Sequence, residues 1–466
     1  MNYRTIFVFI ILLLLLTGCE RPNPPAQIIA VNPPVVEAEA ADTATPEATA
    51  TAVSPPTATP IPPTATATLT PTPFYTGPLS SACGQLLPIL PTNKTAVTTN
   101  ITPNDLALAH LEAIMPDVAQ PAMDRILEAP KTIGLAVYRV GDEANGVYLN
   151  ADLQMPLASV AKVITLVAYA EAVANGEINE TGIVTLDELD QYYLPNFDLG
   201  AHPRAIQELE NSGKLLTNPN AVLMQEVPWM MVRHSSNAAA DYLHMLLGQE
   251  RVEETAVSLN LTSQTAPCTF IGQFLAMGNH TRLKSENQAA INSYIADPLF
   301  YVNELTQLAD AYTSNPDFRA AEQTFRSNRS GPTMNDQRLF SESLNAHGSA
   351  SDYANLMALI AQNGLSSSES SFIARRVLEW PMQFAVNQEI FSNLGYKNGS
   401  LPGILTTVYY AYPIGESAPV VIALFYQDLP NNVYRQWRNS LPHDEFARWI
   451  LGDPAAIPAL RAVINP

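Results

Sequence analysis

The chain has 466 residues, with 24 Lys and Arg against 44 Asp and Glu, which gives a formal net charge of −20. Nucleic-acid binding depends on clustered cations that neutralise phosphates, and no basic run occurs, so nucleic acid and other anionic polymers are disfavoured as partners. The length allows two or three domains, or one enlarged domain with tails.

The first residues have the pattern of an export signal. Arg4 precedes the apolar run 6–16, which is too short to span a membrane. Gly18 and Cys19 follow and resemble the lipobox of bacterial lipoproteins, which implies cleavage before Cys19 and its acylation. We expect residues 1–19 to be a lipoprotein signal peptide. The protein is then exported, anchored by lipid to a membrane, and faces the cell wall or periplasm. A short signal anchor with an incidental Cys is the alternative.

Residues 20–78 consist largely of Pro, Thr, Ala and Val. Such a segment lacks the large apolar side chains that offset the entropy of ordering, so it is predicted to be a disordered tether. Globular composition begins near residue 79, and 79–466 is predicted to be a single domain. It retains Cys83 and Cys268, and the sequence leaves open whether they form a disulfide.

Strand and helix patterns divide this domain in chain order. A hairpin is predicted near 132–149, and a second at 406–426. A nearly apolar helix is predicted at 160–174, which indicates a buried position. Further helices are predicted at 204–212, 238–247, 287–294, 304–312, 353–362, 371–379 and 434–451. Strands at both ends with helices between them predict an α+β fold, in which one antiparallel sheet from both chain ends packs against helices and an all-helical region.

Ser159 and Lys162 stand at the start of the predicted helix 160–174. Residues three apart on a helix are neighbours, so the hydroxyl and the amine share one face. That is the geometry of a nucleophile beside its base. Taken alone, the pair is equally compatible with a serine that caps a helix.

Two further motifs follow in order, Ser-Ser-Asn at 235–237 and Lys-Asn-Gly-Ser at 397–400. With Ser159 and Lys162 they resemble the ordered motifs of the serine β-lactamase and penicillin-binding protein superfamily. The resemblance covers roughly residues 100–452 and is closest to the class A β-lactamases. It implies a β-lactamase/transpeptidase-like fold and an enzyme that is acylated on a serine.

The resemblance also implies roles for the motif residues. Ser159 is the expected nucleophile and Lys162 its base, with a pKa lowered by burial and by the nearby charge of Lys397. Ser235 is expected to pass a proton to the leaving nitrogen. One oxyanion-hole N–H group is expected from Ser159 itself.

Substrate binding is assigned in the same way. Asn237 is expected to hydrogen-bond the substrate amide, and Lys397 and Ser400 to hold the substrate carboxylate. Gly399 is expected to let the strand edge approach the substrate backbone closely.

The chain departs from the class A pattern at several positions. Ser236 stands where the family usually has Asp, and Asn398 where it usually has Thr or Ser. The deacylating Glu is missing from the corresponding stretch 265–274, where Gln273 is too weakly basic to replace it. Solvated helix faces are the expected place of the other nearby glutamates, namely Glu250, Glu253, Glu254, Glu286 and Glu304. The interval between the second and third motifs is long, and the excess predicts a helical insert around 279–345.

Three functions therefore stay open. The first is hydrolysis of β-lactams, the second a D-Ala-D-Ala peptidase acting on peptidoglycan stems, and the third a β-lactam or peptidoglycan binder without turnover. His234 and Asp241 are expected to be structural. We expect no metal site, because His, Cys, Asp and Glu do not occur at the spacings of metal ligands. We also expect that the protein needs no cofactor and is a monomer.

Overall fold

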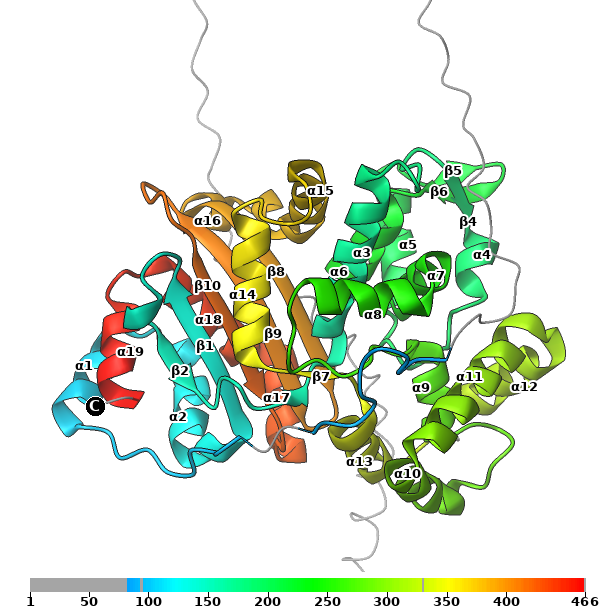
Figure 1. The fold of residues 1–466 in the computed structure, drawn as a ribbon, viewed down its shortest axis with the longest axis horizontal. Coiled ribbons are helices and arrows are strands. Elements are labelled where there is room, and N and C mark those ends of the chain that lie inside the picture. The colour runs from blue at the N-terminus through cyan, green and yellow to red at the C-terminus, as the bar shows by residue number, and fades with distance from the viewer. Residues whose placement is uncertain (1–81, 93–94, 329–330, 465–466) are drawn as a thin grey trace, which may run out of the picture.

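The structure is a computed structural model that describes residues 82–92, 95–328 and 331–464 (Figure 1). The predicted signal peptide at 1–19, the lipidation site Cys19 and the predicted tether at 20–78 lie outside the described residues. Within the described ranges, no helix combines the length and apolar character that a membrane crossing requires.

A five-stranded antiparallel sheet joins the two ends of the domain in the order β2-β1-β10-β9-β8. Its strands are β1 (Ile133–Arg139), β2 (Val147–Leu149), β8 (Phe391–Leu401), β9 (Ile404–Pro413) and β10 (Val420–Tyr426). Strand β1 pairs with β10, so Ile133 lies opposite Tyr426. Both predicted hairpins form, β1 with β2 and β9 with β10. The predicted α+β class, with a sheet built from both chain ends, is confirmed.

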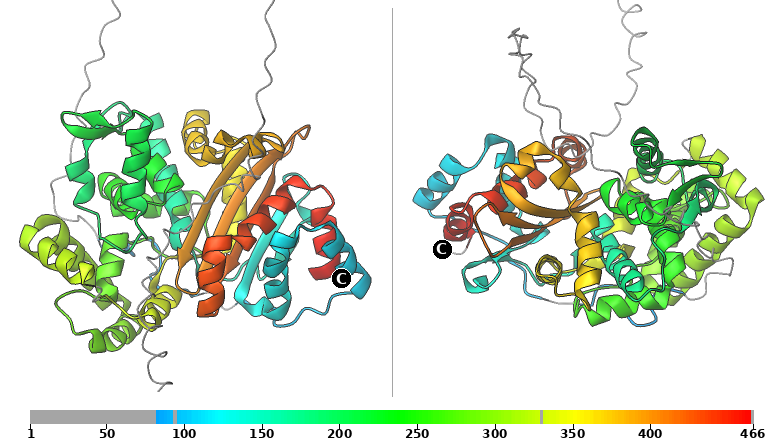
Figure 2. Two further views of the ribbon diagram at one scale, coloured as in Figure 1. Left: turned by 180° about the vertical axis from the view of Figure 1, so that it is seen from behind. Right: turned by 90° about the horizontal axis from the view of Figure 1, so that it is seen from above.

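Helices cover both faces of this sheet, as the uninterrupted apolar sequence of its central strand β10 requires. Every side chain of β10 is buried. One face carries α14 (Ala350–Ala361), in front of the sheet in Figure 1, and the other carries α18 (Pro442–Gly452), which is seen from behind in Figure 2. Helices α1 (Asp105–Ile114), α2 (Gln120–Glu128) and α19 (Ala456–Ile464) complete this second layer.

The prediction of a single helix at 434–451 is wrong. The segment forms α17 (Asn431–Ser440) and α18, and the break lies at Leu441, whose φ is 52°. Pro442 explains the break, because its ring disfavours the α conformation in the preceding residue.

The second half of the domain is helical, with α3 (Lys162–Ala174) at its centre. Helix α3 begins after a 3-10 turn, Ala158–Ala161, and most of its side chains are buried, as its apolar composition predicted. Around it lie α4 (Leu186–Asp190), α5 (Ala201–Asn211), α6 (Glu226–Arg233), α7 (Asn237–Leu247), α8 (Gln249–Ser258), α9 (Phe270–Met277), α15 (Ser368–Leu378) and a small sheet of β4 (Ile183–Thr185), β5 (Leu216–Thr217) and β6 (Asn220–Leu223). The short helix α16 (Ala385–Gln388) packs against β8 instead.

The stretch 279–345 contains helices, as predicted. These are α10 (Asn287–Ala296), α11 (Pro298–Ser314), α12 (Pro316–Ser327) and α13 (Met334–Leu344). They pack with α9 around a hydrophobic cluster of their own, which includes Tyr294, Tyr301, Tyr312 and Phe340. After α13, β7 (His347–Gly348) pairs with β3 (Met155–Pro156), which returns the chain to the segment that precedes Ser159.

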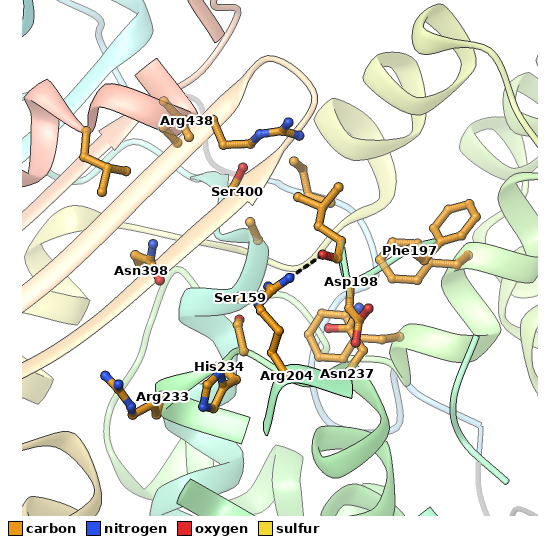
Figure 3. Close-up of a pocket in the computed structure, with 18 of the residues that line it drawn as sticks. Ser159, Phe197, Asp198, Arg204, Arg233, His234, Asn237, Asn398, Ser400 and Arg438 are labelled. Carbon is orange, nitrogen blue, oxygen red and sulfur yellow. Dashed lines mark hydrogen bonds between the residues drawn. The ribbon is translucent and has the colours of Figure 1, made fainter. Parts of the chain in front are cut away.

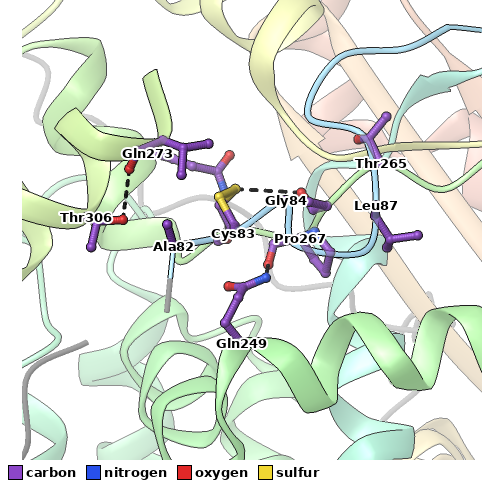
Figure 4. The surroundings of a disulfide bond; sticks show 12 residues. Ala82, Cys83, Gly84, Leu87, Gln249, Thr265, Pro267, Gln273 and Thr306 are labelled. Carbon is purple, nitrogen blue, oxygen red and sulfur yellow. Dashed lines mark hydrogen bonds between the residues drawn. A yellow bond between two sulfur atoms is a disulfide. The ribbon is translucent and has the colours of Figure 1, made fainter. Parts of the chain in front are cut away.

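Cys83 and Cys268 form a disulfide (Figure 4). The bond fastens the first described segment to the loop before α9. Glu253 holds the same segment, because its carboxylate accepts hydrogen bonds from the N–H groups of Gly84, Leu86 and Leu87 at 2.6, 2.7 and 3.0 Å. The prediction that Glu253 lies on a solvated face is therefore wrong, since its side chain is 0% exposed.

Candidate active site

Ser159 lies in the 3-10 turn that leads into α3. The preceding residue, Ala158, has a φ of 49°, a conformation that residues with a side chain rarely adopt. Two contacts hold the turn: the Ala158 N–H donates to Asn345 Oδ1 at 2.9 Å, and Thr406 Oγ1 donates to Leu157 O at 2.8 Å. Strained backbone held by such contacts is common where a reactive side chain must be presented.

Lys162 is buried beneath Ser159, one turn along. Its Nζ lies 3.2 Å from Ser159 Oγ, 2.7 Å from Ser235 O, 3.3 Å from Ser235 Oγ and 2.7 Å from Asn237 Oδ1. Within the part of the chain that the structure describes, no carboxylate hydrogen-bonds or ion-pairs with this amine. The first two motifs therefore meet at one nitrogen.

The pKa of Lys162 suits a general base. Burial lowers it to about 7, while the negative charges of Asp198 and Asp241 oppose the shift. A substantial fraction of the amine is then neutral at pH 7 and is able to take a proton from Ser159 Oγ.

Ser235 joins the second motif to the third. It sits between α6 and α7 with a φ of 65°, which turns its carbonyl and hydroxyl toward the lysines. Lys397 Nζ donates to Ser235 Oγ at 3.1 Å. Burial, and after it the charge of Lys162, holds the pKa of Lys397 well below its ordinary value.

Ser236, which replaces the usual Asp, serves as the N-cap of α7. Its buried hydroxyl accepts from the Ala239 N–H at 3.1 Å and lies 2.9 Å from His202 Nδ1. The uncharged Ser236 hydroxyl therefore fixes the start of the helix that carries Asn237, where the family usually has a charged Asp.

The strand β8 forms the edge of the sheet beside Ser159. A Cβ placed on Gly399 would lie 2.6 Å from Leu157 O and 2.7 Å from Ser159 N. Only glycine allows the strand to approach the serine turn this closely. The next residue, Ser400, has its Oγ 3.0 Å from the Tyr434 hydroxyl.

A cavity of about 170 Å³ opens over these groups (Figure 3). Ser159, Ser235, Asn237 and Ser400 line it, whereas Lys162 and Lys397 lie buried beneath. The structure therefore brings together the seven catalytic and binding residues expected in the domain: Ser159, Lys162, Ser235, Asn237, Lys397, Gly399 and Ser400.

The position beside Lys162 is aromatic. The Phe270 ring centroid lies 4.6 Å from Lys162 Nζ. Gln273, one turn further along α9, is buried, donates to Cys268 O at 2.7 Å and accepts from Asn345 Nδ2 at 3.2 Å. It belongs to the support of the serine turn rather than to the cavity lining.

Sequence reasoning missed the loop before α5. Asp198 lines the cavity next to Asn237 (Figure 3), and it is the one carboxylate among the described lining residues. Its oxygens accept from the N–H groups of Gly200 and His202 at 2.9 and 2.8 Å. An Asp two residues before the Gly that precedes a helix is a capping signal, which was the available clue.

His234 lines the cavity next to Ser235 (Figure 3), whereas Asp241 does not line it. His234 Nε2 lies 2.8 Å from Glu208 Oε2, a partner that the sequence did not reveal, and burial lowers the pKa of His234 to about 4. Asp241 accepts from the N–H groups of Phe270 and Ile271 at 2.8 and 2.7 Å, which fixes the start of α9. Across the described ranges, no group of three or more His, Cys, Asp and Glu side chains is placed to hold a metal ion.

Comparison with known proteins identifies a family for the chain. A family model described as the beta-lactamase enzyme family matches residues 118–436. A comparison with curated proteins found no match. Among solved structures, a beta-lactamase from Sphaerobacter thermophilus is 16% identical with a TM-score of 0.42, and the alignment covers 75% of this chain and 96% of that one. A structure of PBP-A is 14% identical, with a TM-score of 0.39 and coverages of 70% and 95%. A beta-lactamase from Chitinophaga pinensis is 13% identical, with a TM-score of 0.42 and coverages of 73% and 98%.

Proposed function

Because the chain belongs to the beta-lactamase enzyme family, we propose that it is a serine hydrolase that is acylated at Ser159 and hydrolyses β-lactams. The observation that carries the proposal is the contact of 3.2 Å between Ser159 Oγ and the buried amine of Lys162, whose pKa is about 7.

Acylation follows from this contact. Neutral Lys162 takes the Ser159 proton while Oγ bonds to the carbonyl carbon of the substrate. The developing oxyanion is stabilised by the N–H of Ser159 and by an N–H of the β8 edge, which Gly399 brings close. When the tetrahedral intermediate collapses, the carbon–nitrogen bond breaks and the nitrogen must receive a proton.

Ser235 supplies the path for that proton. Its Oγ lies 3.3 Å from Lys162 Nζ and 3.1 Å from Lys397 Nζ. The proton held by Lys162 passes to Ser235 Oγ as the Ser235 proton passes to the leaving nitrogen, so no net charge is left on the serine. Asn237 holds the substrate amide, and Lys397 with Ser400 attracts its carboxylate.

A second candidate is a D-Ala-D-Ala peptidase, with the same acylation steps. The surroundings of Lys162 favour it, because Phe270 and not a carboxylate lies beside this amine. Hydrolysis of a β-lactam ester on Ser159 then depends on water activated by Lys162 alone and is expected to be slow. Slow release of such esters is typical of proteins that β-lactams inhibit.

We propose in addition that the protein is exported and held to a membrane through lipid on Cys19. The disulfide between Cys83 and Cys268 supports this placement, since such bonds persist in oxidising compartments.

Nitrocefin hydrolysis by the purified domain tests the proposal. Turnover that Ser159→Ala abolishes and Ser212→Ala preserves supports it, because Ser212 is an exposed serine at the end of α5. Release of D-alanine from a stem peptide, without nitrocefin turnover, identifies the peptidase instead. Inactivity of the intact protein toward both compounds overturns both candidates.

A further inference from the structure

The cavity at Ser159 continues into a larger groove. A second hollow of about 750 Å³ lies beyond it, and we call this hollow the distal groove; it is lined by Lys284, Arg326, Gln337, Pro402, Tyr434 and Arg438. The two spaces share Phe197, Leu199, Phe274, Ser400, Leu401 and Arg438 as lining residues. A substrate bound at Ser159 therefore has room to extend toward the helices of the stretch 279–345.

The distal groove carries positive charge. Lys284, Arg326 and Arg438 line it, and no Asp or Glu does so among the residues described. In a chain with 44 acidic and 24 basic residues, this local balance is the reverse of the average. A groove lined by one sign of charge concentrates ligands of the opposite sign.

Arg438 stands where the two spaces meet, near Ser400 (Figure 3). Its guanidinium lies 5.8 Å from the centre of the Tyr434 ring and forms no ion pair with any described residue. Its Nε is buried without a hydrogen-bond partner. Such a buried N–H has lost its hydrogen bond to water without gaining a protein acceptor. An anionic acceptor placed beside it would therefore bind favourably.

The stretch 279–345 supplies the other two cations. Arg326 is 3% exposed and its charge is balanced by Glu322, but its Nη1 is buried with no hydrogen-bond partner. Lys284 is exposed on the groove and has no ion-pair partner within the described chain. Donors from two separate elements thus converge on one space.

The edge strand indicates what kind of molecule enters. Strand β8 pairs only with β9 among the described strands, so its other edge, beside the serine turn, has no strand neighbour, although the Asn398 carbonyl accepts from Lys397 Nζ at 2.6 Å. Such an edge binds an extended peptide through main-chain hydrogen bonds. A peptide that lies along it with its C-terminal carboxylate at Lys397 places its preceding residues past Ser400 toward Pro402, which lines the distal groove.

We propose that the distal groove binds a side-chain carboxylate of an extended peptide substrate, with Arg438, Arg326 Nη1 and Lys284 as its donors. This inference rests on the proposed acylation at Ser159 and names the substrate class: an acidic peptide that carries a side-chain carboxylate besides its C-terminal carboxylate, which Lys397 holds.

A binding measurement tests the inference without turnover. The probes are fluorescein-labelled peptides that end in D-Ala-D-Ala, with Glu at each of four positions before that pair, each matched by a Gln peptide. With the Ser159→Ala protein, fluorescence polarisation should show one Glu peptide binding roughly fivefold to tenfold more tightly than its Gln partner at low salt. High salt should remove the difference.

Two substitutions should erase this preference. In the same background, Lys284→Ala and Arg438→Ala together should bring the Glu-to-Gln ratio close to one, while the exposed Lys131→Ala leaves it unchanged. Unfolding temperatures show whether the variants are folded, and Lys284→Ala alone, which removes no described contact, should halve the preference or more.

Three results would overturn the inference: no Glu peptide binds better than its Gln partner, the preference survives the double variant, or no peptide binds at all. Acylation of Ser159 by penicillin G is measured in parallel on the unmodified protein. If penicillin acylates Ser159 and the peptides fail, only the distal-groove inference falls; if penicillin fails as well, the proposed function falls first.

Discussion

The ring of Phe270 lies 4.6 Å from Lys162 Nζ, on the cavity side of the amine that contacts Ser159. An aromatic ring attracts an ammonium weakly and takes no proton from water. Under the proposed function, this geometry separates the two half-reactions: the groups proposed for acylation lie together, and no second base for release is among the described contacts of Lys162.

Burst kinetics are the first expected consequence. Mixing the enzyme with nitrocefin should give a rapid phase close to one equivalent of active sites, followed by a slower steady rate, because acylation outpaces release. Stopped-flow absorbance measures both phases. A linear trace without a burst, with no acyl-enzyme detectable during turnover, would contradict this account.

The pH dependence of acylation should report Lys162. Its amine takes a proton only when neutral, so the acylation rate should rise with pH through an apparent pKa near 7 and then level off. Asp198→Asn removes a negative charge that raises this pKa, and the rising limb should move to lower pH. Asp187→Asn, on the exposed side of α4, is the control. If Asp198→Asn leaves the apparent pKa of the acylation rate unchanged, or raises it, Lys162 is not the base that this pKa reports.

Gly399→Ala should disable the site through steric clash of the added methyl group with the serine turn. The added Cβ would meet Leu157 O and Ser159 N at 2.6 and 2.7 Å, so β8 or the serine turn must shift. Displacing an oxyanion donor typically costs about 10²-fold or more in rate, and we expect a loss of that order in acylation by penicillin G. Gly141→Ala, whose new Cβ has no neighbour within 4 Å but whose φ of +86° strains an alanine, controls for a loss of stability that does not touch the site. Normal acylation by Gly399→Ala would show that the strand does not form the site as described.

The serine, its lysine and the sheet were predictable from the sequence because their signals are local. Ser159 and Lys162 share a turn, and the strands at both chain ends show uninterrupted apolar runs. The meeting of Lys162, Ser235 and Lys397 was expected through the family resemblance, since no pattern of spacing places residues so distant in sequence around the one hydroxyl of Ser235.

Other features depended on contacts that a sequence does not display. Asp198 occupies a loop without periodicity, and its place in the cavity lining depends on how the loop before α5 packs. Glu253 has the sequence setting of a solvated helix residue, yet a segment some 170 residues earlier buries it. The charge of the distal groove likewise appears only when Arg438 from α17 meets helices of the stretch 279–345.

Glu253 should contribute more to stability than its neighbour. Glu253→Gln leaves three backbone N–H groups near the disulfide with a weaker acceptor, which should cost about 1–3 kcal/mol of unfolding free energy. Glu254→Gln, on the exposed face of the same helix, should change it by less than about 0.5 kcal/mol. Urea denaturation compares the two, and equal stability of both variants would contradict the role assigned to Glu253.

Intact-protein mass spectrometry after exposure to penicillin G tests the central claim most directly, with peptide mapping of any adduct. The account predicts one penicilloyl group per chain, on the peptide that contains Ser159, and none on the Ser159→Ala variant. An unmodified protein after prolonged exposure, or an adduct of equal yield in Ser159→Ala, would contradict it.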